Sequence, residues 1–396
     1  MSIACLSLKY YVLFLRTISL KPEVFFQVLK EQGVEFYTGV PDSTLKHFCF
    51  FMDSQTSQNS HIIAANEGSA IGIATGYYLS TGKVPLVYMQ NSGFGNALNP
   101  ITSLVDETVF SIPMIIMMGW RGEPGVKDAI QHKKDGEVQE DILKSLNLSY
   151  THISNDLVEM KNQMEDIFDS VKNNNEPHVI LVSKNYFQRF NSQQVVIDKA
   201  NFLTREMALT HIINNIEDDD VVVSTTGKCS RELYEIRKKL YMNPDRDLRI
   251  VGSMGHVSSV ALGLSINISN QVICIDGDGS LIMHMGTLPT IGKYSKNNFK
   301  HIILNNFSHD SVGGQDTSSN YIDYENLAYS TSYKNYFQID NKASFVDLFK
   351  SFRASEGPSF LEIVVSKGSN ENLTRPKTTP LDNRKYFMNF LKNIDR

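Results

Sequence analysis

The sequence predicts an α/β protein built from two lobes, each a parallel sheet flanked by helices. Three observations predict this class. Short β-rich apolar runs alternate with helical patterns along the whole chain, which is typical of helices that cover both faces of parallel sheets. The chain has 396 residues, too many for one ordinary core. A polar stretch without clear periodicity, residues 185–201, separates two halves that carry the same alternation.

The first half begins with a helix, because Pro22 is favoured at a first helical position and Gly33 can end the helix. A second helical pattern covers Ser69–Leu79. The predicted strands are Val34–Thr38, His61–Ala65, Val84–Met89, Pro113–Met118 and His178–Val182. These elements complete one lobe over residues 20–184, and residues 185–201 are predicted to be the linker.

The second lobe, residues 202–396, is predicted to start with a helix near Leu203–Ile216. Its predicted strands are Asp220–Ser224, Gln271–Ile275, His301–Leu304 and Phe360–Val365. No repeat of individual residues relates the two halves, so any duplication concerns the fold pattern alone.

Composition and charge argue against several classes of protein. With 41% hydrophobic and 20% charged residues, the chain is expected to be soluble and globular. A net charge of −5 without long runs of one sign argues against nucleic-acid binding and favours a small-molecule partner. No C-x-x-C pair occurs, so neither a zinc site nor a disulfide framework is indicated, and a reducing, cytoplasmic compartment is expected. The four cysteines are Cys5, Cys49, Cys229 and Cys274.

Residues 1–19 form an extension ahead of the first lobe. The apolar run Tyr10–Leu15 lies between Lys9 and Arg16, which resembles a weak targeting sequence. The run is too short to span a bilayer, so no membrane association is expected, and no A-x-A cleavage pattern follows it. Two interpretations stay open, an organelle import signal and a plain N-terminal addition.

The sharpest chemical signal is the turn Gly277-Asp278-Gly279-Ser280, which follows a predicted strand and precedes a helical pattern. Glycines let backbone amides approach an anion, and a helix N-terminus adds partial positive charge, so a diphosphate can bind there. Asp278 offers a hard oxygen ligand for Mg²⁺. Taken alone, the pattern is equally compatible with an ordinary turn.

A second polar pair, Asn305-Asn306, directly follows the predicted strand His301–Leu304, and 25 residues separate it from Gly279. That length holds one helix and one return strand. Two neighbouring parallel strands would therefore deliver Asp278 and Asn306 to the same edge of the sheet, where open α/β sheets bind ligands. A carboxylate, an amide oxygen and phosphate oxygens suit octahedral Mg²⁺.

Gly-Asp-Gly followed at this distance by Asn-Asn resembles the cofactor motif of the thiamine diphosphate enzyme superfamily. The resemblance implies thiamine diphosphate and Mg²⁺ as cofactors, with metal ligands from Asp278, Asn306 and the main-chain carbonyl of Ser308. It also implies that the diphosphate lies against Gly277, Gly279 and Ser280.

The same resemblance assigns roles to three further segments. Glu67, at the start of a helical pattern, matches the family's catalytic glutamate, which bonds to the cofactor's aminopyrimidine ring; alone, it would be read as a charge favoured at a helix N-terminus. Ser253 and Met254 match the segment beneath the cofactor, although Met254 also suits an irregular gap in a core. Thr226-Gly227 either contacts the diphosphate or forms a turn.

Within the superfamily, the chain resembles the compact decarboxylases that act on phosphonopyruvate and sulfopyruvate, because it has no room for a third domain. Four segments strengthen this match: Thr38–Ser43, Tyr88–Gly93, Gly119–Gly125 and His309–Gln315. The resemblance runs from about Leu20 to the end, departs at the N-terminal extension and is unaligned after Gly368. It implies decarboxylation of 3-phosphonopyruvate to phosphonoacetaldehyde and CO₂.

A small anionic 2-oxo acid of this kind needs cationic or N–H donors. The loop Arg121–Lys134 offers them, and we expect Arg121 and His132 to bind the substrate, Arg121 through its planar fork. The alternative interpretation is that His132 is only a histidine on the surface of the loop. His309 either assists a proton transfer or only fixes its loop.

Alternative functions remain. Sulfopyruvate is the nearest alternative substrate, because a sulfonate differs from a phosphonate mainly in charge. A nicotinamide-dependent oxidoreductase is a further alternative, but no G-x-G-x-x-G motif opens a βαβ unit. A binding subunit without activity is disfavoured, because Glu67, Asp278 and Asn306 are all present. The resemblance further implies a homodimer or larger homo-oligomer whose sites are shared between two chains.

Overall fold

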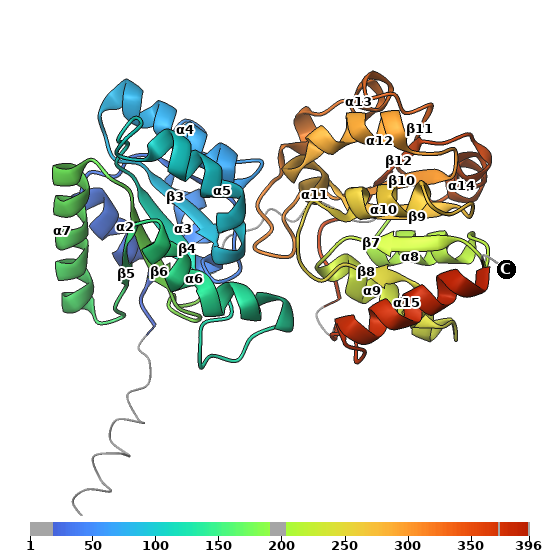
Figure 1. The fold of residues 1–396 in the computed structure, drawn as a ribbon, viewed down its shortest axis with the longest axis horizontal. Helices are drawn as coiled ribbons and strands as arrows, with labels where there is room; N and C mark the ends of the chain where they lie inside the picture. The colour runs from blue at the N-terminus through green and yellow to red at the C-terminus, as the bar shows by residue number, and fades with distance from the viewer. Residues whose placement is uncertain (1–18, 191–202, 371–372, 395–396) are drawn as a thin grey trace, which may run out of the picture. The chain divides into compact units, whose positions relative to one another are not determined.

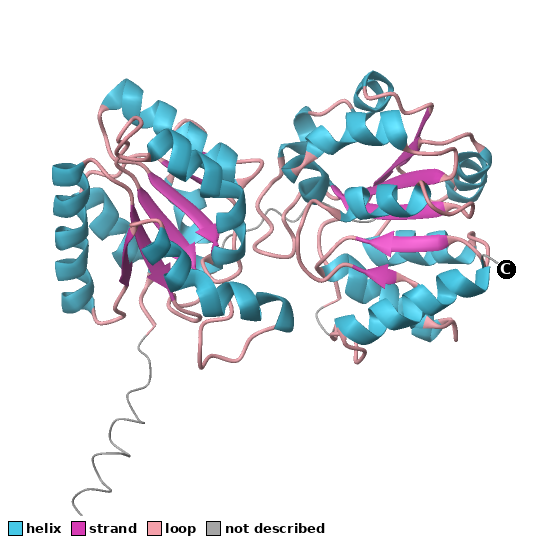
Figure 2. Ribbon diagram, viewed as in Figure 1, coloured by secondary structure: helices cyan, strands magenta, loops and turns pink. Residues whose placement is uncertain are grey.

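The computed structural model describes residues 19–190, 203–370 and 373–394. The chain divides into two compact units, Met1–Gln194 and Val195–Arg396. Each unit contains a six-stranded parallel sheet with helices packed against it, which Figure 2 shows by colour. The predicted α/β class is therefore confirmed. No helix in the described ranges is long and apolar enough to cross a membrane.

The sheet of the first unit has the strand order β2-β1-β3-β4-β6-β5, and all its pairings are parallel. The strands are β1 (Tyr37–Gly39), β2 (His61–Ile63), β3 (Leu86–Gln90), β4 (Ile115–Gly119), β5 (Ser149–His152) and β6 (His178–Val182). The helices are α2 (Pro22–Glu31), α3 (Lys46–Gln55), α4 (Glu67–Thr81), α5 (Phe94–Pro100), α6 (Lys133–Ser145) and α7 (Leu157–Asn174). Short η1 (Asn91–Gly93), η2 (Ile101–Val105) and η3 (Ile130–His132) complete the unit.

Side-chain alternation along the buried strands creates two cores in this unit. On β4, Ile115 and Met117 pack with α2, α3 and α7, whereas Ile116 and Met118 pack with α4, α5 and α6. The helices thus cover both faces, and Figure 1 shows them by label. Strands buried on both faces read as continuous apolar runs, which is why the sequence predicted β4 and β6 well.

The sheet of the second unit has the order β11-β12-β10-β9-β7-β8, again with parallel pairs. The strands are β7 (Val221–Ser224), β8 (Leu248–Arg249), β9 (Val272–Gly277), β10 (Phe299–Asn305), β11 (Asn335–Ile339) and β12 (Ser359–Val364). The helices are α8 (Arg205–Asn214), α9 (Lys228–Lys239), α10 (Val257–Ser265), α11 (Asp278–Met283), α12 (Leu288–Tyr294), α13 (Tyr324–Ser330), α14 (Phe345–Ala354) and α15 (Pro380–Ile394). Short η4 (Pro244–Arg246), η5 (Met285–Thr287) and η6 (Ser318–Tyr321) lie between them.

Each sheet has one topological switch point, at which the connections from two neighbouring strands run in opposite directions. In the first unit it lies between β1 and β3, and in the second unit between β7 and β9. Ligands of open α/β sheets bind in the crevice outside the carboxyl ends of such strands. Thr226 and Gly227 lie in the loop that follows β7, and Asp278 and Gly279 begin α11 directly after β9; the sequence marks all four as candidate site residues.

Three strands were not predicted: β5, β8 and β11. They are edge strands, and the half-exposed residues of β5 and β11 give no apolar run. At the end of the first unit, Tyr186 and Phe187 are buried in its core, although they fall in the stretch expected to be linker. The bridge from Leu20 to Phe187 ties the start of this unit to its end. Most of the remaining linker, and the extension 1–18, lies outside the described residues.

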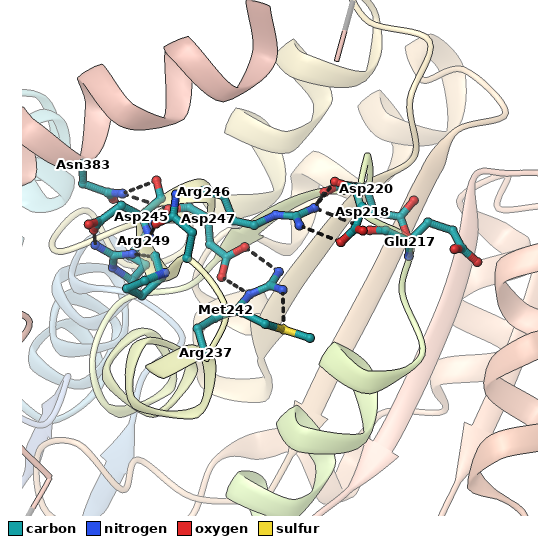
Figure 3. Close-up of polar contacts among 12 residues, drawn as sticks. Glu217, Asp218, Asp220, Arg237, Met242, Asp245, Arg246, Asp247, Arg249 and Asn383 are labelled. Atoms are coloured by element: carbon teal, nitrogen blue, oxygen red, sulfur yellow. Dashed lines mark hydrogen bonds and ion pairs between the residues drawn. The ribbon is translucent and has the colours of Figure 1, made fainter. Parts of the chain in front are cut away.

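Buried arginines hold the outer helices of the second unit (Figure 3). Arg237 on α9 donates two hydrogen bonds to Asp247, of 2.9 and 2.8 Å. Asn383 on α15 donates to the Asp247 carbonyl over 2.9 Å and accepts from the amide of Arg249. Because these groups are buried, each requires its partner, and the network fixes α15 against β8 and η4.

Candidate active site

Three predicted cofactor segments converge on Ser280 at the switch point of the second unit. The hydroxyl of Thr225 donates to Ser280 Oγ over 3.0 Å, and the amide of Gly255 donates to the same oxygen over 3.2 Å. Thr225 precedes the predicted pair Thr226-Gly227, and Gly255 follows Met254. The structure therefore brings the loop after β7 and the first turn of α11 together with the segment before α10.

Gly227 occupies a position that only glycine fits. Its φ is +88°, and a Cβ there would lie 2.7 Å from the hydroxyl of Ser311. Gly227 caps α9, so the first amides of that helix face the switch point. Backbone amides at such an N-terminus can bind an anion.

Asp278 and Asn306 follow neighbouring parallel strands, as predicted. β9 and β10 pair with Gly277 opposite Leu304, so both side chains start from the same edge of the sheet. Asp278 is buried and accepts a 2.5 Å hydrogen bond from the hydroxyl of Thr317. Burial raises the pKa of Asp278 to about 6, although hydrogen bonds from Thr317 and from backbone amides oppose this shift.

The Asn306 side chain is held at both ends of its amide. Its Nδ2 donates to Asp310 over 2.8 Å, and its Oδ1 accepts from the amide of Ser308 over 3.1 Å. Asn306 and Ser308 are both buried. A carbonyl oxygen has two lone pairs, so Oδ1 keeps one for a metal ion.

The donor set fits a magnesium diphosphate. Among the described residues, no group of three His, Cys, Asp or Glu side chains is placed to hold a metal. One carboxylate, one amide oxygen and one main-chain carbonyl are instead the hard, weakly charged ligands that Mg²⁺ takes together with phosphate oxygens. In the same loop, Ser308 Oγ and both amide atoms of Gln315 are buried without a hydrogen-bond partner in the part of the chain that the structure describes.

His309 lies against the turn Gly277–Ser280, called the metal turn below because it carries the candidate ligand Asp278. Two atoms of its ring are 3.1 Å from the position that a Cβ on Gly279 would take. Burial lowers the pKa of His309 to about 4, although Asp316 opposes this shift, so the imidazole is neutral at pH 7.

Met254 is half-buried and belongs to neither hydrophobic core of the second unit. Both of its neighbours have a positive φ, +53° at Ser253, which is unusual for a residue with a side chain, and +88° at Gly255, which glycine adopts readily. A Cβ on Gly255 would lie 2.4 Å from the ring of His284. The segment therefore takes a tight path that exposes part of the methionine, instead of filling a core gap with it.

Glu67 begins α4 in the first unit and is 4% exposed. Asn66 caps the helix by accepting from the amide of Ser69, which places Glu67 in the first turn. The Asn96 amide donates to Glu67 Oε2 over 2.8 Å. A Cβ on Gly93 would lie 2.0 Å from Glu67 Oε1, so the carboxyl group packs directly on this glycine. Burial raises the pKa of Glu67, and the bond from Asn96 opposes that shift.

Arg121 follows β4 and is fixed on several sides. Its Nε and Nη2 each donate to Asp128 over 2.6 Å, and Nη1 donates to Ser43 over 2.7 Å. Asn91 bonds to both the amide and the carbonyl of Arg121. Three of the five guanidinium N–H groups are used in this way, which leaves one N–H on each terminal nitrogen for a ligand.

The two candidate substrate residues of the first unit come from one closed loop. His132, at the end of η3, is half-buried, and its carbonyl oxygen would be 1.9 Å from a Cβ on Gly122. Gly122 has a φ of +71°. A glycine is therefore required where the backbone of His132 returns to Arg121.

Several residues of these sites were not predicted individually, among them Asn96, Thr317, Asp310 and Gln315. Asp310 and Gln315 lie in the segment His309–Gln315, which the sequence marked only as a whole. Asn96 and Thr317 are separated from Glu67 and Asp278 by 29 and 39 positions, so no local pattern reveals these contacts.

Two family models match the chain. Residues 22–144 match the N-terminal TPP binding domain of thiamine pyrophosphate enzymes, and residues 225–363 match their C-terminal TPP binding domain. Thiamine pyrophosphate is another name for thiamine diphosphate. The matched ranges include Glu67 in the first case and Asp278 and Asn306 in the second.

Three curated relatives align over almost the whole chain. The phosphonopyruvate decarboxylase of Streptomyces viridochromogenes is 31% identical, covering 91% of this chain and 92% of the relative. The phosphonopyruvate decarboxylase of Streptomyces hygroscopicus is 28% identical over 90% of each chain. The sulfopyruvate decarboxylase of Methanosarcina acetivorans is 28% identical, covering 92% of this chain and 96% of the relative. The chain therefore belongs to the thiamine pyrophosphate enzyme family, as a carboxy-lyase of the group that includes the phosphonopyruvate and sulfopyruvate decarboxylases.

Proposed function

We propose that this protein converts 3-phosphonopyruvate to phosphonoacetaldehyde and CO₂ with thiamine diphosphate and Mg²⁺. The observation that carries the proposal is that Asp278 and Asn306 follow the paired strands β9 and β10 at the same edge of the sheet, in a chain that aligns over 90% or more of its length with two phosphonopyruvate decarboxylases. This support favours the proposal over a nicotinamide-dependent oxidoreductase.

The second unit would hold the metal and the diphosphate. Asp278, Asn306 and the carbonyl of Ser308 would bind Mg²⁺, while backbone amides at Gly277, Gly279 and Ser280 and at Thr226-Gly227 would approach the phosphate oxygens. Ser253 and Met254 would lie beneath the cofactor. When bound, thiamine diphosphate supplies an electron sink for the bond that breaks as CO₂ leaves.

Glu67 would hold and move the proton of the cofactor's pyrimidine ring. A buried carboxyl group with a raised pKa exchanges a proton near neutral pH more readily than an exposed one. Asn96 fixes Oε2 of the carboxyl group, and Oε1 lies against Gly93, so the carboxyl group would be held in one orientation toward the ring. His309, neutral at pH 7, would donate or accept a hydrogen bond near the metal turn.

Arg121 and His132 would bind the anionic substrate. Asp128 orients the Arg121 guanidinium but also neutralises it, so the contribution of Arg121 to substrate binding would come from its fixed N–H geometry more than from net charge. The lysine of an Arg121→Lys variant would keep the charge and lose that geometry.

We also propose a homodimer, or a larger assembly of dimers, in which each complete site draws on two chains. The proposal rests on the family resemblance and on the separation of the two half-sites into different units, one with Glu67 and one with Asp278.

The test is a parallel assay of 3-phosphonopyruvate and sulfopyruvate with added thiamine diphosphate and Mg²⁺. We expect kcat/KM for 3-phosphonopyruvate to exceed that for sulfopyruvate. Sulfopyruvate is the second candidate because the Methanosarcina relative aligns over as much of the chain. A preference for sulfopyruvate would replace the proposed substrate, and activity on neither acid would refute both.

A further inference from the structure

Asp310 links the metal loop to a buried arginine and to the chain beyond β12. Its Oδ2 accepts three hydrogen bonds: from Asn306 Nδ2 over 2.8 Å, from the amide of Gly368 over 2.8 Å and from Arg205 Nη1 over 3.5 Å. The Asp310 and Arg205 side chains are 11% and 8% exposed. Asp310 itself is not placed to bind the same ion as Asn306 through that oxygen, since three donors already occupy it.

We propose that Asp310 is a positioning residue that orients the side-chain amide of Asn306 and thereby sets the affinity for the metal. The proposal rests on the proposed function, because it assumes that Asn306 binds Mg²⁺. It adds a residue that would act on the metal through Asn306.

The chemistry of the amide explains why orientation matters. The two ends of an asparagine side chain have nearly the same shape, but only the oxygen can bind a cation. An ionised carboxylate accepts hydrogen bonds and donates none, so the NH₂ group of Asn306 must face Asp310. The oxygen then points to the other side, where it meets the amide of Ser308 over 3.1 Å. A flipped amide would present N–H donors to the metal.

Arg205 keeps Asp310 in place. It is the first residue of α8, and it donates to Glu232 on α9 over 2.6 Å through Nε and over 3.1 Å through Nη2. This fork fixes the guanidinium, so Nη1 has little freedom to leave Asp310. The carboxylate is therefore held by Arg205 at the start of α8 and by the backbone amide of Gly368 in the segment after β12, and these contacts fix the orientation of Asn306.

The experiment measures metal binding directly. Mn²⁺ replaces Mg²⁺, and free Mn²⁺ is followed by electron paramagnetic resonance while it is titrated into the purified full-length protein with saturating thiamine diphosphate. We expect Asp310→Ala to raise the Kd for Mn²⁺ by about 10- to 100-fold, the range typical when a partner of a metal ligand is removed. Asp310→Ser serves the same purpose if the alanine variant does not fold.

Asp310→Asn is the rescue variant. Its amide oxygen can take the position of Oδ2 and accept all three hydrogen bonds, so we expect a Kd within about 3-fold of the wild-type value, a difference below 1 kcal/mol. If the asparagine variant binds Mn²⁺ as weakly as the alanine variant, charge and not orientation is responsible, and the proposal is wrong.

Asp220→Ala is the matched control. Asp220 Oδ2 also accepts one backbone amide, from Glu217 over 2.8 Å, and one arginine N–H, from Arg353 over 2.7 Å. It precedes β7, at the amino end of the sheet and away from the metal loop. We expect this variant to lose stability and to keep the wild-type Kd. Wild-type affinity in Asp310→Ala would overturn the proposal, whereas failure of the wild-type protein to bind Mn²⁺ with thiamine diphosphate would instead refute the proposed function.

Discussion

At the scale of single residues, Glu67 shows how the fold prepares a carboxyl group for chemistry. It is buried at the start of a helix, where a charge is favoured by the helix dipole but penalised by the loss of water. Within the part of the chain that the structure describes, the side-chain hydrogen bond to it comes from Asn96. The carboxyl group is thus held in one orientation without a cationic partner that would fix its charge.

Glu67→Gln should separate cofactor binding from catalysis. The amide keeps the shape and can still accept from Asn96, but it cannot exchange a proton with the pyrimidine ring. We expect thiamine diphosphate to bind within a few-fold of wild type, while kcat falls by about 10²- to 10⁴-fold. Proton exchange at C2 of the bound cofactor, measured by NMR, is the direct readout. An exchange rate in Glu67→Gln equal to that of wild type would contradict the role proposed for Glu67.

The same substitution should change stability in a pH-dependent way. Because the pKa of Glu67 is raised in the folded protein, its contribution to stability is fully present below the unfolded pKa, at about 4.3, and is lost as pH rises through the folded pKa. Cofactor-free Glu67→Gln should therefore have a higher Tm than wild type at pH 8, and the two Tm values should converge below pH 4. A difference independent of pH would contradict this assignment.

At the scale of elements, the loops that follow the strands do the positioning, and glycines allow the close approaches. Gly93 ends η1 immediately before α5, and its missing side chain makes room for Glu67 on α4. Packing between two helices thus decides where the carboxyl group lies. The missing side chain of Gly279 likewise leaves room for the ring of His309.

Gly93→Ala should displace Glu67, because the new Cβ would lie 2.0 Å from Oε1. Overpacking of this kind costs about 1–3 kcal/mol of stability, and we expect kcat to fall by at least about 10-fold as the carboxyl group moves. Gly95→Ala, on α5, is the control, since a Cβ there meets nothing within 4 Å. Equal kcat values for the two variants would contradict the placement of Glu67.

The sequence predicted the central strands and the adjacency of Asp278 and Asn306, because buried parallel strands give apolar runs and short turns with distinctive residues follow them. It did not predict the edge strands β5 and β11, whose half-exposed residues give no such run. Contacts such as Asp310 with Arg205, 105 positions apart, depend on how helices pack and leave no local pattern.

At the scale of the whole molecule, the two units carry different parts of one proposed site. In that proposal, the first unit would supply Glu67 and the substrate-binding Arg121, and the second unit would supply Asp278 and Asn306 for the metal. Under the proposed function, Glu67 and Asp278 belong to different units, so assembly of two chains would be part of catalysis.

Mixing two inactive variants tests shared sites. Glu67→Gln and Asp278→Ala, combined under conditions that exchange subunits, should regenerate about a quarter of wild-type activity, since half of randomly mixed dimers carry one intact site of two. Subunit exchange is checked with differently tagged chains by co-purification. No recovery despite demonstrated exchange would rule out sites shared in this way.

The cofactor and metal requirement tests the central claim most directly. The protein is stripped with EDTA, dialysed, and assayed for CO₂ release from 3-phosphonopyruvate with thiamine diphosphate and Mg²⁺ added singly and together. We predict activity only when both are present, and none in Asp278→Ala, which should fail to retain the cofactor. Undiminished CO₂ release from the stripped protein without additions would contradict the account.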